Sequence, residues 1–185
     1  ANQSPEVLER IINEDKVNQA IYGAGNAMAQ PFNHRILPLA TSSDKRTQIK
    51  WGITAFESVF NRQPEGMWLP ETAVDMETLE IMADMGIKFT ILAPWQVEVI
   101  EGNSPYVAEL ENGRSIVVFV YHGALSSTMS FDTFATGNAD AFAEWAGRST
   151  SLAEVLEASR ARRERGEPVR WHVPLCEPLV HRLEG

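Results

Sequence analysis

The chain has 185 residues, of which 44% are hydrophobic and 22% are charged, a composition typical of a folded globular protein. Its formal net charge is −9 and its pI is about 4.9. Such acidity argues against a general binder of nucleic acid, because that function depends mainly on clustered Lys and Arg. The basic cluster from Arg160 to Arg165 is interspersed with acid and is typical of a solvent-exposed helix face. We therefore expect no nucleic-acid partner.

Cysteine content and hydropathy indicate the cellular compartment in which the protein is expected. Cys176 is the single cysteine, so no internal disulfide can form and no zinc site can be built from thiolates, which fits a reducing compartment. No stretch approaches the roughly 18 apolar residues of a membrane span, and the polar N-terminus lacks a signal-peptide pattern. We predict a cytoplasmic protein with no membrane partner, and a single domain over residues 1–185. The sequence does not indicate its oligomeric state.

The first part of the chain predicts two helices and a short strand. Ser4 suits the N-cap of a helix whose first residue is Pro5. Residues 43–61 predict a second helix, because apolar residues recur there at helical spacing: Ile49, Ile53, Phe56 and Phe60. Residues 67–69 predict a short buried strand.

The segment "GMWLPETAVD", residues 66–75, turns from this strand directly into a helix. Pro70 ends the strand, and Asp75 is a suitable N-cap for a helix that Gly86 ends. Residues 87–92 predict the next strand. A helix, a glycine and a strand at this spacing are typical of a βαβ unit, which implies parallel strands with helices outside.

The later part of the chain predicts an antiparallel hairpin near residues 106–121. Two β-rich runs flank Asn112-Gly113, a pair typical of two-residue hairpin turns. Residues 151–165 predict a last helix and residues 168–175 a last strand. The sequence therefore predicts an α/β fold with an antiparallel hairpin insertion.

Glu71 lies where chemistry is expected in such a fold. In parallel α/β sheets, functional side chains gather where strands end and loops begin. Glu71 follows the predicted strand at once, so its carboxylate would point into a cleft at the carboxyl edge of the sheet. The alternative is a surface acid that the dipole of the following helix favours.

Two segments of the sequence resemble glycoside hydrolase family 57. "QPEGMWLPETAVDMETLEIMADMGIKFTILAP" is similar to the family segment in which an aromatic-rich strand ends in the catalytic Glu. "NAMAQPFNHRILPLA" is similar to the preceding block, in which a His stands before an "ILPL"-type run. The resemblance extends over about residues 20–145, and it is strongest to a bacterial subgroup with an extra, uncharacterised C-terminal domain.

This resemblance implies a fold, a reaction and a site. The fold is an irregular (β/α)7-type barrel or part of one. The reaction is that of a retaining glycoside hydrolase or glucanotransferase acting on an α-glucan or maltooligosaccharide, without a cofactor. Glu71 takes the position of the nucleophile, and His34 that of a residue hydrogen-bonded to the sugar. Asn26 stands where many members have Glu, and His122 where Asp is expected in "YDG"; both are assigned to sugar contacts.

Two tryptophans complete the predicted substrate site. Trp68 and Trp95 each lie next to a strand end, where a ring could stack on a pyranose face. Packing in the core is the alternative for Trp68, whereas the loop position of Trp95 favours the cleft. For His34 the alternative is a loop histidine bonded to the backbone.

The second carboxylate of the reaction is not apparent. A retaining enzyme places two carboxyl groups about 5–5.5 Å apart. Neither the family's Asp-Gly-Glu-type block nor its opening His-Gln-Pro-type block is found in the chain. Asp132 and Glu177 are candidate replacements, with an ordinary surface or capping acid as the alternative for each. The chain is therefore either an excerpt of a longer enzyme or a catalytically incomplete carbohydrate-binding or regulatory member.

A metal-dependent barrel of the polysaccharide deacetylase kind is a further alternative. Such barrels hold zinc through an Asp and two His. His34 and His122 could meet in space, but His172 and His181 add no pair at i, i+4 spacing, and a third ligand cannot be named. We therefore expect no metal site.

Overall fold

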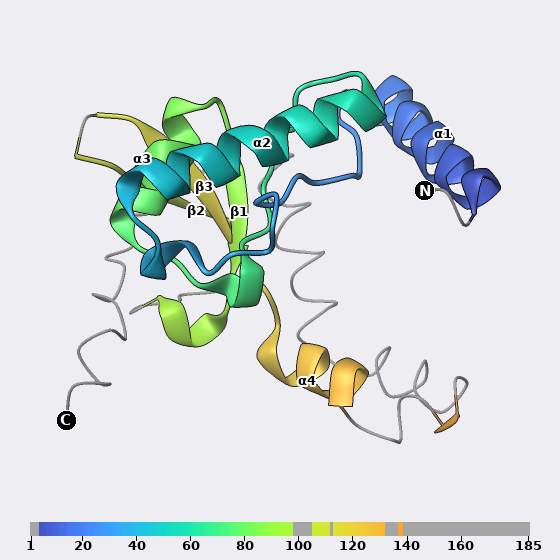
Figure 1. Ribbon diagram of the computed structural model, residues 1–185. Coiled ribbons are helices and arrows are strands. Elements are labelled where there is room, and N and C mark those ends of the chain that lie inside the picture. Colours follow the sequence, from blue (N-terminus) through green and yellow to red (C-terminus); the bar gives the residue numbers. More distant parts are fainter. Residues whose placement is uncertain (1–3, 98–104, 112, 132–136, 139–185) are drawn as a thin grey trace, which may run out of the picture. The chain divides into compact units, whose positions relative to one another are not determined.

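We describe the fold from a computed structural model in which residues 4–97, 105–111, 113–131 and 137–138 are described. Within these ranges the chain forms four α-helices and three strands (Figure 1). It divides into two compact units, Ala1–Thr90 with Leu110–Ile116, and Ile91–Glu109 with Val117–Gly185. The predicted helix at 151–165 and the predicted strand at 168–175 lie outside the described residues, as do Cys176, Asp132 and Glu177.

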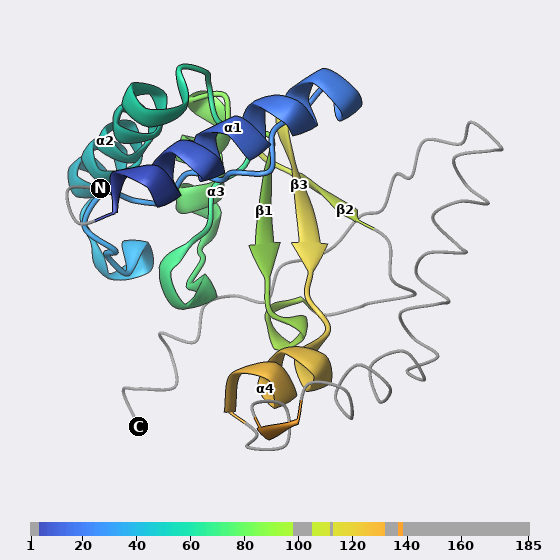
Figure 2. The same ribbon diagram turned by 90° about the vertical axis from the view of Figure 1, so that its right-hand side faces the viewer.

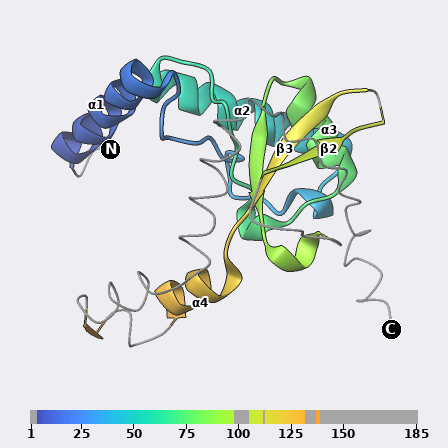
Figure 3. The same ribbon diagram turned by 180° about the vertical axis from the view of Figure 1, so that it is seen from behind.

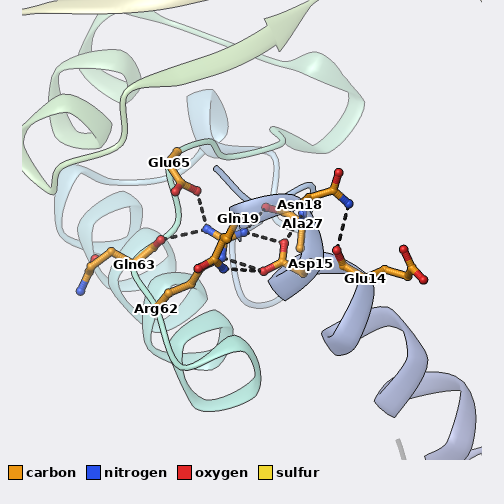
Figure 4. A network of polar contacts seen from close by, with 8 residues as sticks. All are labelled: Glu14, Asp15, Asn18, Gln19, Ala27, Arg62, Gln63 and Glu65. Carbon is orange, nitrogen blue, oxygen red and sulfur yellow. Dashed lines mark hydrogen bonds and ion pairs between the residues drawn. The ribbon is translucent and has the colours of Figure 1, made fainter. Parts of the chain in front are cut away.

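Helix α1, Pro5–Tyr22, begins at the predicted proline and ends where Gly23 takes a left-handed conformation. Its apolar residues do not form a buried face, since Val7 and Ile11 are about half exposed. The residue that α1 buries is Asp15. A polar network therefore holds this helix in place (Figure 4).

The network centres on the ion pair of Asp15 with Arg62, which follows the C-terminus of the next helix. Arg62 Nε and Nη2 each donate to a different oxygen of Asp15 at 2.8 Å, and Nη1 pairs with Glu65. The Ala27 N–H donates to Asp15 at 2.9 Å, and Arg62 donates to the Ala27 carbonyl at 3.1 Å. The hydrogen bonds from Arg62 hold the pKa of Asp15 at about 2, although burial opposes that shift.

Helix α2, Ser42–Phe60, confirms the helix predicted over residues 43–61. Thr41 caps its N-terminus by accepting from the Asp44 N–H, and Asn61 ends it in a left-handed conformation. The residues of its buried face are Lys45, Gln48, Ile49, Gly52, Ile53 and Phe56. Figure 1 shows α1 near one end of α2 and α3 near the other, and α2 contacts both.

The strand predicted at residues 67–69 is wrong in extent. The structure has two isolated parallel bridges instead, Gly66 with Phe89 and Met67 with Ala29. Pro70 has no N–H and opens a 3₁₀ turn, Pro70–Thr72, so the extended segment ends after these bridges. Met67 and Leu69 are nevertheless fully buried.

Helix α3, Met76–Asp84, has the predicted cap. The Asp75 carboxylate accepts from the Thr78 N–H at 2.8 Å, and Gly86 is left-handed. Strand β1, Phe89–Leu92, begins two residues later than the strand predicted at 87–92. The Ile87 N–H donates to the Met82 carbonyl, so this residue still belongs to the end of the helix.

The remaining described elements are β2, Tyr106–Glu109, β3, Ser115–Val120, and α4, Gly123–Phe131. The sheet order is β1-β3-β2. Figures 2 and 3 show β3 beside β1, and both arrows point the same way. This confirms the α/β class, with a small mixed sheet. Asn112 of the predicted turn lies outside the described residues. None of the described helices is long and apolar enough to cross a membrane.

Candidate active site

The parallel bridges bring two predicted site residues together within the first unit. Met67 pairs with Ala29, and the Trp68 N–H donates to the Ala29 carbonyl at 2.8 Å. The two segments run in the same direction, so the loops that follow them emerge at the same edge. One of these loops carries His34 and the other carries Glu71.

His34 and Glu71 face one another across this edge. The distance from His34 Nε2 to Glu71 Oε1 is 3.7 Å, and the two side chains are 57% and 78% exposed. This separation is too long for a direct hydrogen bond. Both side chains are exposed and accessible to a ligand, and a contact between exposed side chains of this kind contributes little to stability.

The backbone at this pair is unusual. His34, Glu71 and Thr72 have φ values of 51°, 54° and 54°, in the left-handed region that few residues other than glycine adopt. Each such residue costs on the order of 1–2 kcal/mol, and the cost is greatest for a β-branched residue such as Thr72. Strained backbone persists only where the surrounding structure holds it, and it is found most often at functional sites.

Lys45 of α2 supports the loop that carries Glu71. Its side chain is 3% exposed, and Nζ lies 2.5 Å from Asp75 Oδ2 and 2.6 Å from Glu77 Oε2. Burial would lower the pKa of Lys45, but the hydrogen bonds and charges of the two acids outweigh it and raise that pKa. Burial would also raise the pKa of Asp75, but hydrogen bonds from Lys45 and Thr78 bring it below its ordinary value.

Gln48, one turn further along α2, supports the loop that carries His34. Its side-chain Oε1 accepts from the Asn33 N–H at 2.9 Å, and its backbone carbonyl accepts from the Phe32 N–H at 3.2 Å. Neither Lys45 nor Gln48 was predicted from the sequence to belong to the site. A signal existed, because both polar residues lie on the apolar stripe of α2 together with Ile49.

Asn26 and Trp68 belong to the same unit. Asn26 is exposed in the loop after α1, and Trp68 is half-buried beside the bridged residues. The half-burial of Trp68 leaves its two interpretations, sugar stacking and core packing, both open. The sugar contacts of Asn26 and Trp68 stay predictions.

Trp95 and His122 belong to the second unit. Tyr121 directly precedes His122 in the chain and contacts Trp95. Trp95 is 66% exposed, and its ring meets that of Tyr121 edge-on, with centroids 6.0 Å apart. His122 is exposed at the residue before α4, and its carbonyl accepts from the Ser126 N–H at 2.9 Å. Tyr121 was not among the predicted site residues, although it stands in the same "YHG" run as His122.

In the part of the chain that the structure describes, no group of three or more His, Cys, Asp or Glu is arranged to hold a metal ion. The candidate site is the pair of an exposed carboxylate and an exposed imidazole, with chemistry suited to nucleophilic attack and hydrogen bonding.

Sequence comparison connects this geometry to a family. The chain matches glycosyl hydrolase family 57 over residues 18–167. It belongs to this family. The resemblance drawn from the segments around Glu71 and His34 is thereby confirmed. No curated protein matches the chain.

Solved structures show the same fold. A 4-alpha-glucanotransferase from Thermococcus litoralis is 18% identical, with a TM-score of 0.57 over 70% of this chain and 20% of the other. A family 57 branching enzyme from Thermococcus kodakaraensis, in complex with glucose, is 19% identical, with a TM-score of 0.52 over 69% and 28%. An alpha-amylase from Thermotoga maritima is 18% identical, with a TM-score of 0.55 over 69% and 25%. The chain thus spans 20–28% of the length of these three structures.

Proposed function

We propose that this chain supplies the nucleophile of a retaining enzyme that acts on α-glucans, either as a glycoside hydrolase or as a glucanotransferase. Family membership supports the reaction class. The names of the similar structures, a glucanotransferase, a branching enzyme and an amylase, support an α-glucan as substrate. The observation that carries the proposal is the exposed Glu71 carboxylate opposite His34, at the end of a parallel-bridged segment. The chain then forms part of an irregular (β/α)7-type barrel with an antiparallel insertion near residues 106–121.

The proposed reaction has two steps. The Glu71 carboxylate attacks the anomeric carbon, the glycosidic bond breaks, and the leaving oxygen takes a proton from a second carboxyl group. Water or a sugar hydroxyl, which gives its proton to that second carboxylate, then attacks the anomeric carbon of the glucosyl ester and releases Glu71. His34 Nε2, 3.7 Å from Glu71, would hydrogen-bond a hydroxyl of the bound sugar. Asn26, Trp68, Trp95 and His122 are proposed sugar contacts.

A second candidate is a member of the family that binds carbohydrate without cleaving it. The sequence observation behind it is the absence of the Asp-Gly-Glu-type block that carries the second carboxylate. Such a member would retain His34 and the proposed aromatic contacts. Glu71 would then hydrogen-bond the sugar instead of attacking it.

Intact-mass measurement after incubation with a fluorinated α-glucosyl fluoride tests the proposal. Fluoride leaves with little help from a general acid, so the probe reports on the nucleophile even where the second carboxylate is missing. We expect a stable glucosyl adduct on the wild type and none on Glu71→Gln. Glu111→Gln removes an exposed carboxylate from the same unit and serves as the matched control, which should form the adduct.

Two other outcomes contradict the nucleophile role. Binding of maltooligosaccharide without an adduct would identify a carbohydrate-binding member. An adduct that persists in Glu71→Gln would place the nucleophile on another residue. Intact mass distinguishes the two cases, and peptide mapping identifies the labelled residue in the second.

A further inference from the structure

We propose that Lys45 and Gln48 are positioning residues, and that one face of α2 fixes both loops of the His34–Glu71 pair. The two residues are one turn apart and both are buried on this face. Lys45 fixes the loop with Glu71, and Gln48 fixes the loop with His34. The catalytic consequence rests on the proposed function of Glu71, but the geometric claim does not.

The Lys45 contact acts through Asp75. This carboxylate uses Oδ1 to accept from the Thr78 N–H, which caps α3, and Oδ2 to accept from Lys45 Nζ. Asp75 thereby connects the start of α3 to Lys45 in the first turn of α2. Only three residues separate Glu71 from Asp75. The first part of this segment belongs to the turn at Glu71, because the Ala73 N–H donates to the Pro70 carbonyl at 3.0 Å. A shift of Asp75 would therefore be transmitted to the turn that holds Glu71.

The Gln48 contact acts on the residues directly before His34. Gln48 accepts from two consecutive N–H groups, that of Asn33 through its side chain and that of Phe32 through its backbone. The His34 N–H in turn donates to the Pro31 carbonyl at 3.2 Å, which closes the tight turn. Further along α2, Gly52 has no side chain and allows the Gln30 carbonyl to approach closely. Three residues of the loop, Gln30, Phe32 and Asn33, thus contact α2 at two of its positions, Gln48 and Gly52.

These contacts direct geometry more than they add stability. A buried ion pair can often be replaced by apolar residues of similar volume without loss of stability, so stability alone does not account for a lysine on the apolar stripe of α2. Its ammonium group fixes the directions of two carboxylates, Asp75 and Glu77. The exposed Glu71 and His34 side chains gain little from packing, and both have left-handed backbones that neighbouring contacts must hold.

Crystal structures of variants test the geometric claim directly. Lys45→Met and Gln48→Leu remove the polar contacts while keeping similar side-chain volume. We expect Lys45→Met to displace the turn at residues 70–72, and Gln48→Leu to displace His34, so that each lengthens the 3.7 Å separation. Gln48→Glu retains the acceptor for the Asn33 N–H and should keep the wild-type geometry. Variants that keep the wild-type separation and the positive φ of Glu71 would overturn the proposal.

Labelling kinetics with the fluorinated α-glucosyl fluoride test the catalytic consequence. Misplaced reacting groups slow bond formation, so the maximal rate of adduct formation should fall about tenfold or more in Lys45→Met and Gln48→Leu. The concentration for half-maximal labelling should change much less. Ile53→Val weakens packing on the same face of α2 and removes none of the hydrogen bonds to either loop, and it should label at the wild-type maximal rate.

The two measurements separate the two proposals. A wild type that forms no adduct would contradict the nucleophile role of Glu71, while the crystal structures would still decide whether Lys45 and Gln48 set its position. A rate that falls equally in Ile53→Val and Lys45→Met would indicate a general effect of stability and would contradict positioning.

Discussion

Glu71 combines an exposed side chain with a strained backbone, and this combination predicts how substitutions of this one residue change stability. Glycine adopts the left-handed region without the steric cost that other residues incur, about 1–2 kcal/mol. We expect Glu71→Gly to be as stable as the wild type or more so, and Glu71→Val to be about 1–2 kcal/mol less stable, because Val is β-branched. Urea unfolding followed by circular dichroism measures both values.

The same two substitutions at Glu9 provide the control. Glu9 is an exposed residue inside α1, where glycine is the poorer helix former by a few tenths of a kcal/mol or more compared with valine. The order of stability should therefore reverse between the two sites. If glycine is also the less stable variant at position 71, the left-handed conformation of Glu71 is contradicted.

The sequence predicts the identity of the central residues better than their conformation. Glu71 and His34 were found because they stand in recognisable motifs, and the structure brings them together. Their left-handed backbone was not predicted, because glutamate rarely adopts positive φ, and histidine, although enriched there, adopts it in only a small share of cases. Lys45 was missed because its ion pairs are with residues about thirty positions away, and such contacts leave only an unexpected charge on an apolar stripe.

At the scale of the element, Gly52 determines how closely α2 approaches the loop before His34. Alanine normally stabilises a helix interior by about 1 kcal/mol relative to glycine. A Cβ at Gly52 would overlap the Gln30 carbonyl, a backbone atom that cannot move without its loop. Overpacking of this kind costs about 1–3 kcal/mol, so we expect Gly52→Ala to lose stability.

Thermal unfolding of Gly52→Ala beside Thr54→Ala measures this effect. Thr54 is exposed on α2, and its replacement by alanine should be neutral or slightly stabilising. A Gly52→Ala variant that is more stable than the wild type would show that α2 does not press on the Gln30 carbonyl.

The helices were easier to predict than the extended segments. Thr41, Asp75 and Gly86 act through local hydrogen bonds or local backbone freedom, so the bounds of α2 and α3 follow closely from the sequence. The segment at residues 66–69 pairs only through long-range bridges, to Ala29 and Phe89. An apolar run predicts burial there, but it does not predict how many residues find partners.

At the scale of the whole molecule, resemblance supplied what local patterns could not. The order of helices and strands predicted an α/β fold, but the family was reached through two motifs in the correct order, and the family match confirms it. The predicted barrel and the single domain concern the arrangement of the complete chain and stay predictions. The identity of the second carboxylate also stays open to prediction only, since the candidates Asp132 and Glu177 lie outside the described residues.

The ion pairs of the first unit predict how global stability depends on pH. The pKa of Asp15 is lowered from 3.8 to about 2, chiefly by the hydrogen bonds from Arg62, and the pKa values of Asp75 and Glu77 are also lowered. A carboxyl group whose pKa is lower in the folded state stabilises it above the unfolded pKa, and this contribution is lost as pH falls through the folded pKa. The pKa values of Lys45 and Arg62 are raised, so their contributions are complete below the unfolded pKa and are lost only as pH rises through the folded pKa.

We therefore expect the contribution of these groups to be constant between about pH 5 and pH 10 and to fall on both sides. The shift of Asp15 corresponds to about 2 kcal/mol, lost between about pH 4 and pH 2. Asp15→Asn leaves Arg62 nearly buried without its main partner, which should cost about 3 kcal/mol at pH 7, whereas exposed Glu14→Gln should cost almost nothing. Urea unfolding from pH 2 to pH 8 gives the free energy of unfolding at each pH. The difference in this free energy between the wild type and Asp15→Asn should shrink by about 2 kcal/mol in acid. Curves that stay parallel would show that the pKa of Asp15 is not lowered in the folded protein, and that α1 is held by other contacts.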